Sequence, residues 1–333
     1  MLIVICACGQ AMKVPEGAIG RKGKCSSCHK KLDITEDNTF GIADFPAARS
    51  GGQSGSEEAS KPLGRSIAIT SGKGGVGKSN IVINLSFALG ERGKKVLVID
   101  ADMGLPNVQL LTGLKCRYDI EDVLDGKRTV EEIIVTDETG VMFVTSSAGV
   151  PKLVDLGPDE REVFIKTFEE LENRADFILI DTAGGVGRDV MDFVLAADEV
   201  LVITTREPTA MMDAYSMLKS MYARNRLVRP RLLVNMARGL REAEGVTRQI
   251  SEAANAFLDT PLVPLGYVPR DSHVQTAVIK RRPFIHMFPK SPASVATRDL
   301  AERLIGEVPV CMEEKESLMK RFLSAFHRDL KTI

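Results

Sequence analysis

Seven short apolar runs recur along most of the chain, and longer stretches with a helical apolar period lie between them. The runs are residues 66–70, 95–100, 140–146, 177–183, 199–205, 231–236 and 262–268, and the helical stretches include 78–91, 160–173, 208–223 and 241–257. Nearly continuous apolar runs are typical of strands buried on both faces, and their alternation with helices indicates a parallel sheet covered on both sides. We therefore predict an α/β fold with a mainly parallel, doubly wound sheet.

The loop after the first run, SGKGGVGKSN, fits the pattern G-x-x-x-x-G-K-[ST] and stands between a predicted strand and a predicted helix. Its glycines allow a tight turn whose backbone N–H groups face phosphate oxygens. Lys78 is expected to reach the β and γ phosphates of ATP, and the Ser79 hydroxyl to hold Mg²⁺. The predicted nucleotide-binding residues here are Gly72, Gly74, Gly75, Val76, Gly77, Lys78, Ser79 and Asn80. This pattern needs one lysine and leaves the second, Lys73, unexplained.

Acidic residues follow two of the predicted strands, at the carboxyl edge where ligands bind in folds of this class. Asp100 and Asp102 share one face of their strand because side chains alternate. Asp181 follows four apolar residues, which is the Walker B arrangement, in which the carboxylate holds Mg²⁺ through water. We predict that Ser79 and Asp181 form the magnesium site, with Asp100 as a nearby phosphate or magnesium contact.

The sequence KGGVGKS resembles the deviant Walker A motif of the MinD/ParA family of P-loop ATPases. This resemblance implies a homodimer formed with ATP, in which Lys73 crosses to the partner's nucleotide. It also implies that Asp102 orients or activates the attacking water. The predicted catalytic residues are therefore Lys73, Lys78 and Asp102, and the resemblance places the adenine beside Asn235, Pro269 and Arg270.

Within this family, stretches such as TTREPTAMMDAYSMLKSM and FPKSPAS resemble the FlhG branch, also called FleN or YlxH, over roughly residues 65–308. Members of that branch regulate flagellar number and placement, so the resemblance implies a flagellar assembly or regulatory protein as partner. Two alternatives stay open. One is a MinD-like ATPase that positions the division site or a cargo, and the other is a zinc-ribbon regulatory module switched by the ATPase dimer.

The N-terminal residues 1–35 carry two close cysteine pairs, Cys6 with Cys8 and Cys25 with Cys28. Four thiolates in two pairs are typical of a zinc ribbon, so we predict structural Zn²⁺ there. Six basic and two acidic side chains make this segment basic, but it has no aromatic residue to stack on bases. A protein partner is therefore favoured over nucleic acid. Residues 36–64, rich in Gly, Ser and Ala, are predicted to be a flexible linker.

At the other end, residues 312–333 predict an amphipathic helix with an apolar face opposite a basic one. The apolar face consists of Leu318, Met319, Phe322, Leu323, Phe326 and Leu330. This pattern is typical of a helix that lies in a membrane interface. A terminal helix docked on the protein's own core has the same pattern, and both interpretations stay open.

Composition and charge bear on the partners and the cellular location of the protein. The chain has 333 residues, 44% hydrophobic content and a formal net charge of −1, so its overall charge indicates no attraction to nucleic acid. No run approaches the roughly 20 apolar residues of a membrane span, and the cysteine spacing does not suggest a disulfide framework. We expect a cytoplasmic protein, with reversible association to the inner face of the cell membrane as an option.

Overall fold

The computed structural model describes residues 2–5, 11–24, 31–34, 39–41, 63–102, 107–145, 158–226, 228–258, 260, 262–306, 317, 318 and 321. Its internal contacts divide the chain into two compact units. The N-terminal unit comprises Met1–Ser60 and Val310–Glu314, and the main unit comprises Lys61–Pro309 and Lys315–Ile333.

The N-terminal unit is built from short antiparallel strands. They are β1 (Leu2–Ile5), β2 (Ala11–Val14), β3 (Lys22–Lys24), β4 (Lys31–Asp33) and β5 (Thr39–Gly41), with a 3₁₀ turn at Glu16–Ala18. Strand β1 pairs with β2 and β5, and β3 pairs with β4. Ala18 and Ile34 are buried together. The predicted zinc ligands Cys6, Cys8, Cys25 and Cys28 lie outside the described residues, as does most of the predicted linker.

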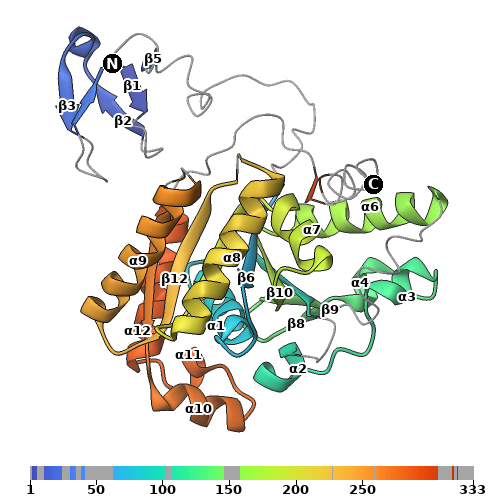
Figure 1. Ribbon diagram of the computed structural model, residues 1–333. Helices are drawn as coiled ribbons and strands as arrows, with labels where there is room; N and C mark the ends of the chain where they lie inside the picture. The colour runs from blue at the N-terminus through green and yellow to red at the C-terminus, as the bar shows by residue number, and fades with distance from the viewer. Residues whose placement is uncertain are drawn as a thin grey trace. The chain divides into compact units, whose positions relative to one another are not determined.

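The main unit contains an eight-stranded sheet in the order β13-β12-β11-β6-β10-β7-β9-β8 (Figure 1). Its strands are β6 (Arg65–Ser71), β7 (Val96–Ala101), β8 (Val135–Thr136), β9 (Met142–Thr145), β10 (Phe177–Gly184), β11 (Glu199–Thr204), β12 (Pro230–Ala237) and β13 (Val263–Pro269). All neighbours pair in parallel except β8 with β9. The prediction of a mainly parallel α/β sheet is confirmed, and each of the seven predicted runs forms a strand.

Helices of the main unit cover both faces of this sheet. They are α1 (Lys78–Gly90), α2 (Asn107–Thr112), α3 (Ile120–Leu124), α4 (Val130–Ile133), α6 (Pro158–Arg174), α7 (Arg188–Ala196), α8 (Pro208–Arg224), α9 (Leu240–Leu258), α10 (Ser272–Ile279), α11 (Phe284–Met287) and α12 (Pro292–Gly306). The four helices predicted from apolar periodicity are confirmed as α1, α6, α8 and α9. No helix among the described residues is long and apolar enough to cross a bilayer.

Alternating side chains of the central strand β6 separate the two layers of core. Ile67 and Ile69 are buried in a cluster with residues of α1, α2, α11 and α12. Ala68, between them, belongs to a second cluster with residues of α7, α8 and α9. Every residue of β6 is buried, which is the reason why this strand reads as a continuous apolar run. The loop that follows β6 therefore emerges from the centre of a rigid sheet.

Three residues of the predicted C-terminal helix are described, and they pack on the main unit. Leu318 is fully buried in a third core cluster that includes residues of α3, α4 and α6. The Arg321 Nη1 atom lies 2.9 Å from Asp198 Oδ1. For these residues the contacts favour a helix docked on its own core. The remaining residues of the predicted apolar face, from Met319 onward, lie outside the described part of the chain.

Candidate functional site

The phosphate loop joins the end of β6 to the start of α1. Gly75 and Gly77 have φ angles of +82° and +89°, which residues with a side chain rarely adopt. Gly77 immediately precedes α1, and no side chain caps this helix start. The first N–H groups of α1 therefore need a partner from outside the helix, and a phosphate oxygen is well suited to supply it.

Two further glycines hold the loop by close backbone contact. A Cβ atom on Gly72 would lie 2.1 Å from the carbonyl oxygen of Asp213 in α8. A Cβ atom on Gly184, at the end of β10, would lie 2.8 Å from the backbone nitrogen of Gly74. A larger side chain would push the loop away from α8 at Gly72, or from the end of β10 at Gly184, so the sequence sets the loop's position as well as its turns.

Two carboxylates are buried below this loop on neighbouring strands. Asp181 of β10 and Asp100 of β7 are register partners, 2% and 3% exposed. Burial raises the pKa of Asp181 to about 7, although Ser79, which bonds its carboxylate, and nearby Lys78 act in the opposite direction. Burial likewise raises the pKa of Asp100 to about 6, against hydrogen bonds from the backbone of Asp102 and Val108. Both groups favour a positive charge beside them.

The Asp181 carboxylate fits a magnesium ion. Its Oδ1 atom is buried and accepts no hydrogen bond from any described residue, and its side chain bonds that of Ser79. Mg²⁺ in nucleotide sites is held by one or two protein groups, waters and the phosphates themselves. Within the described ranges no cluster of three or more His, Cys, Asp or Glu side chains could hold a metal alone. Ser79 and Asp181 are the residues that would supply the protein's share of such a site.

Asp102 differs from these carboxylates because it is only half-buried. Its backbone N–H donates to Asp100 Oδ1 at 3.2 Å, and its Oδ2 accepts from Asn107 Nδ2 at 3.3 Å. The side chain therefore stands at the carboxyl edge of β7, held by the start of α2. This is the predicted position for a group that contacts water beside a bound phosphate chain.

Lys73 is engaged within its own chain. Its Nζ lies 2.9 Å from Glu207 Oε2 and 3.0 Å from Thr209 Oγ1, at the start of α8. This ion pair lowers the pKa of Glu207. In contrast, Lys78 is buried below the loop, and only 7% of the residue is exposed. The two lysines of the loop therefore lie in different surroundings, as expected if they have different roles.

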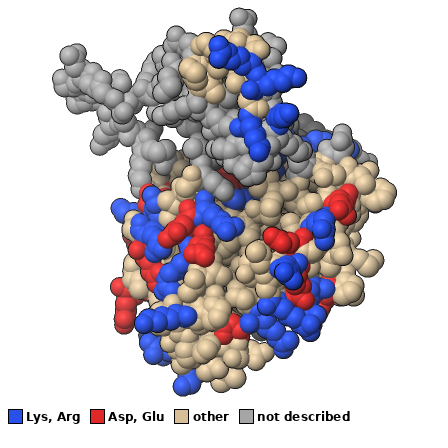
Figure 2. Space-filling view, turned by 90° about the vertical axis from the view of Figure 1, so that its left-hand side faces the viewer, with Lys and Arg blue, Asp and Glu red and all other residues tan. Residues whose placement is uncertain are grey.

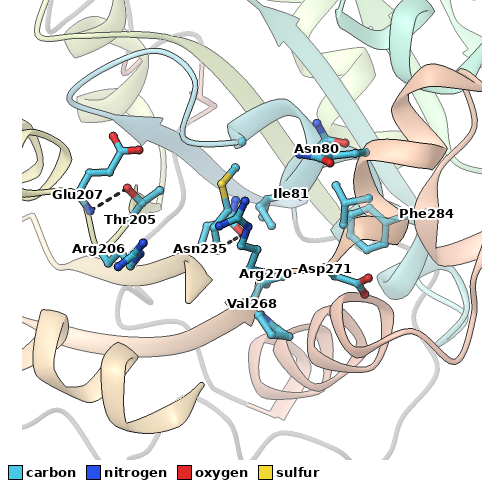
Figure 3. Close-up of a pocket in the computed structure, with 15 residues that line it drawn as sticks. Asn80, Ile81, Thr205, Arg206, Glu207, Asn235, Val268, Arg270, Asp271 and Phe284 are labelled. Atoms are coloured by element: carbon cyan, nitrogen blue, oxygen red, sulfur yellow. Dashed lines mark hydrogen bonds between the residues drawn. The ribbon is translucent and has the colours of Figure 1, made fainter. Parts of the chain in front are cut away.

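A cavity of about 290 Å³ adjoins the phosphate loop. It is lined by the predicted Gly77, Asn80, Asn235, Pro269 and Arg270, together with Ile81, Thr205, Arg206, Glu207, Met236, Val268, Asp271, Val274, Gln275 and Phe284. Figure 3 shows Arg206 and Arg270, which come from different loops, on either side of Asn235. Pockets for small ligands combine an apolar lining with a few polar groups in this way. The size and position suit a nucleoside whose phosphates continue into the loop.

Asn235 lies between this cavity and the loop, and its amide already has two partners. Nδ2 donates to the Val76 carbonyl oxygen at 2.8 Å, and Oδ1 accepts from the Met236 N–H at 2.9 Å. An amide retains a second donor hydrogen and a second acceptor position. Asn235 can therefore bond a base while it fixes the loop, a positioning role that the sequence did not suggest.

Comparison with known proteins agrees with this geometry. The family model described as AAA domain matches residues 64–233. The antiactivator FleN of Pseudomonas aeruginosa is 36% identical over 238 residues, which cover 72% of this chain and 85% of FleN. The chain belongs to the MinD/ParA family of P-loop ATPases. MinD of Bacillus subtilis is 33% identical, covering 79% of this chain and 98% of MinD, and YlxH of Helicobacter pylori is 32% identical, covering 77% and 89%.

Solved structures of MinD/ParA proteins share this fold. The MinC:MinD complex of Aquifex aeolicus matches with a TM-score of 0.59 and 30% identity, over 76% of this chain and 99% of that one. MinD of Pyrococcus horikoshii, solved with Mg-ADP, matches with a TM-score of 0.58 and 27% identity, over 73% of this chain and 97% of that MinD chain.

Several residues of this MinD/ParA site were not predicted from the sequence. Arg206 and Glu207 follow β11, and Thr209 lies in the first turn of α8. They line the cavity or hold Lys73. They could have been predicted in the same way as Asp100 and Asp181. Polar residues directly after a buried parallel strand lie at the edge of the sheet where ligands bind.

Proposed function

We propose that this protein is an ATPase that dimerises with ATP and regulates the number or placement of flagella. The observation that carries the proposal is the 36% identity to FleN over 72% of this chain. The similarity to YlxH, named as a flagellum site-determining protein, supports the same role. The buried carboxylates and the loop with two lysines support the ATPase chemistry.

In this proposal each residue of the site has one task. The loop N–H groups and Lys78 bind the phosphates, and Asp102 orients the attacking water. Ser79 and Asp181 hold Mg²⁺, which supplies positive charge at the β and γ phosphates when bound. Asn235, Pro269 and Arg270 border the adenine. Phosphoryl transfer of this kind depends on positioning and charge stabilisation more than on covalent chemistry.

Lys73 completes the site of the partner in a sandwich dimer. To cross, its ammonium has to leave Glu207, whose side chain is 65% exposed. Exposed ion pairs are weak, so phosphate oxygens of a partner's nucleotide can replace this contact. Light scattering should therefore show an ATP-dependent dimer for the wild type and a monomer for Lys73→Ala. A Lys73→Ala chain that dimerises as the wild type does would remove the crossing role.

The flagellar role is tested in cells. Deletion of the gene should change the number or position of flagella counted by electron microscopy, and Asp102→Ala should reproduce the change. Normal flagella in both strains would contradict this role. The similarity to B. subtilis MinD over 98% of its length favours a MinD-like positioning ATPase as the second candidate. Minicells after deletion would support that candidate.

The N-terminal unit is proposed to be a zinc ribbon that binds a protein partner, with Cys6, Cys8, Cys25 and Cys28 as ligands. Its strands β1–β2 and β3–β4 flank the cysteine pairs in sequence, as in ribbons with two metal-binding turns. Promoter occupancy in cells that requires Cys25 and Cys28 would instead favour the regulatory module switched by the ATPase dimer. A cytoplasmic location fits both interpretations.

Nucleic acid is not proposed as a ligand. On the face of the main unit seen in Figure 2, Lys and Arg side chains are interspersed with Asp and Glu. Ion pairs of the main unit include Arg298 with Glu91 and Arg92 with Glu302. Non-specific DNA binding requires many uncompensated cations along one surface.

A further inference from the structure

The end of α10 carries exposed aliphatic side chains directly beside a run of cations. Ile279 is 82% exposed and Val278 37% exposed. Helix α2 packs against α10 (Figure 1) and adds Leu110, which is 40% exposed. Lys280, Arg281 and Arg282 follow at once and are all exposed. We call these six residues the α10 tip.

The α10 tip is a fixed part of the main unit. Ala277, on the opposite face of α10, is 1% exposed, and Phe284 and Ile285 just after the tip are buried. The turn after the helix is held by backbone hydrogen bonds, including Arg281 N–H to Val278 O at 3.0 Å and Arg282 N–H to Ala277 O at 3.1 Å. The cations are therefore presented at defined positions around the aliphatic side chains.

The cations of the tip are not tied up in ion pairs with described residues. None of Lys280, Arg281 and Arg282 forms an ion pair with a residue in the described part of the chain. Gly113, at the end of α2, packs against the turn, since a Cβ atom there would lie 3.3 Å from the Arg281 carbonyl oxygen. Lys115 and Arg117, both exposed, follow shortly after it. The apolar side chains of the tip thus adjoin several exposed cations.

We propose that the α10 tip inserts into the surface of an anionic lipid bilayer. Aliphatic side chains that enter the headgroup region, together with cations that contact acidic lipids, are the two components of interfacial binding. A side chain that is 82% exposed projects from the surface, which suits a soft planar partner. Contact with a second copy across a two-fold axis would place two copies of this basic patch in one interface. The tip has no aromatic residue to stack on nucleic-acid bases.

The test uses the full chain and co-sedimentation with vesicles of equal parts phosphatidylglycerol and phosphatidylcholine, against vesicles of phosphatidylcholine alone. The wild type should sediment with the anionic vesicles only. Ile279→Asp should weaken this partition by at least about tenfold, because it replaces an inserted apolar side chain by an anion. Lys280→Glu with Arg282→Glu should weaken it further, since each cation near such a surface contributes about fivefold. Arg281 is kept because its φ angle is +51°.

Matched controls distinguish binding by the α10 tip from binding by other exposed apolar residues or by the predicted terminal helix. Phe257→Asp removes a similarly exposed apolar side chain (77%) from α9 and should sediment like the wild type. A chain that ends at residue 321 keeps the packed Leu318 and Arg321 but lacks the rest of the predicted terminal helix, and it should retain the dependence on Ile279. Unchanged melting temperatures would show that the variants fold. Absence of wild-type binding to anionic vesicles would overturn the proposal, as would full binding by Ile279→Asp. The proposal does not rest on the flagellar role.

Discussion

At the scale of single residues, the site combines buried acids with a lysine held at the surface. Asp181 and Asp100 lie below the phosphate loop with raised pKa values because burial disfavours their charged forms. Lys73, above them, keeps its ammonium on Glu207. These carboxylates therefore hold protons more tightly than ordinary aspartates, at the place where Mg²⁺ is proposed to bind. The charge of the site depends on pH. The position of Lys73 depends on its ion pair with Glu207, which a phosphate can replace.

The raised pKa of Asp181 predicts that the nucleotide-free protein loses stability as pH rises. The folded pKa of about 7 exceeds the usual value of 3.8. Folding is therefore favoured most below about pH 4, and the contribution, at most about 4 kcal/mol, is lost as pH rises through about 7. Asp181→Asn should reduce the difference in melting temperature between pH 5 and pH 8. An unchanged difference would show that the carboxylate does not titrate in this range.

The contact of Lys73 with Glu207 predicts the effect of releasing the lysine. Glu207→Gln removes the carboxylate charge that pairs with Lys73 in the same chain, and it leaves the phosphate loop unchanged. We expect the protein concentration needed for ATP-dependent dimerisation to stay the same or to fall. The decrease should be no more than about a few-fold, because the ion pair is exposed. Glu242→Gln is the matched control, since Glu242 pairs with Arg206 at the same cavity, 3.7 Å away. Loss of dimerisation in Glu207→Gln, with Glu242→Gln normal, would instead give Glu207 a direct role in the dimer.

Among the elements, the helices and strands that follow a repeated apolar pattern could be predicted from the sequence. Features that depend on one contact between distant residues could not. Strand β6 and its parallel neighbours were predictable because burial on both faces produces continuous apolar runs. Strand β8, with two residues at the sheet edge, is too short to show a period. The phosphate loop was predictable from its spacing. The ion pair of Lys73 with Glu207 joins residues 134 positions apart, which no local pattern reveals.

The close contact between β10 and the phosphate loop predicts a specific sensitivity. In Gly184→Ala, the new Cβ would lie 2.8 Å from the Gly74 nitrogen, so the loop has to move. We expect at least about tenfold weaker ATP binding, measured by titration calorimetry, because overpacking at a rigid contact is costly. Gly187→Ala, three residues further on and with nothing within 4 Å of the new Cβ, should bind ATP normally. Equal affinity in both variants would mean that the loop adapts.

At the scale of the whole molecule, two units with separate cores share one chain. The main unit carries the nucleotide site and the α10 tip, and the N-terminal unit has its own small cluster around Ala18 and Ile34. Leu318 returns from the C-terminal region to the main core. A unit as small as the N-terminal one buries little apolar surface, so a bound metal would contribute much of its stability.

This organisation predicts that zinc and ATP bind independently. Reduced, purified protein should contain one zinc ion per chain by metal analysis, and Cys25→Ser with Cys28→Ser should remove it. ATP affinity should stay unchanged in that variant, because the phosphate loop and its supporting contacts belong to the main unit. Wild-type protein without zinc would contradict the ribbon.

In our proposal the chain hydrolyses ATP as a dimer in which Lys73 acts across the interface. The decisive experiment is to measure the ATP hydrolysis rate per chain over a wide range of protein concentration. For the wild type the rate should rise with concentration and then level off, and for Lys73→Ala it should stay low throughout. A wild-type rate per chain that is independent of concentration, and is matched by Lys73→Ala, would rule out hydrolysis by such a dimer.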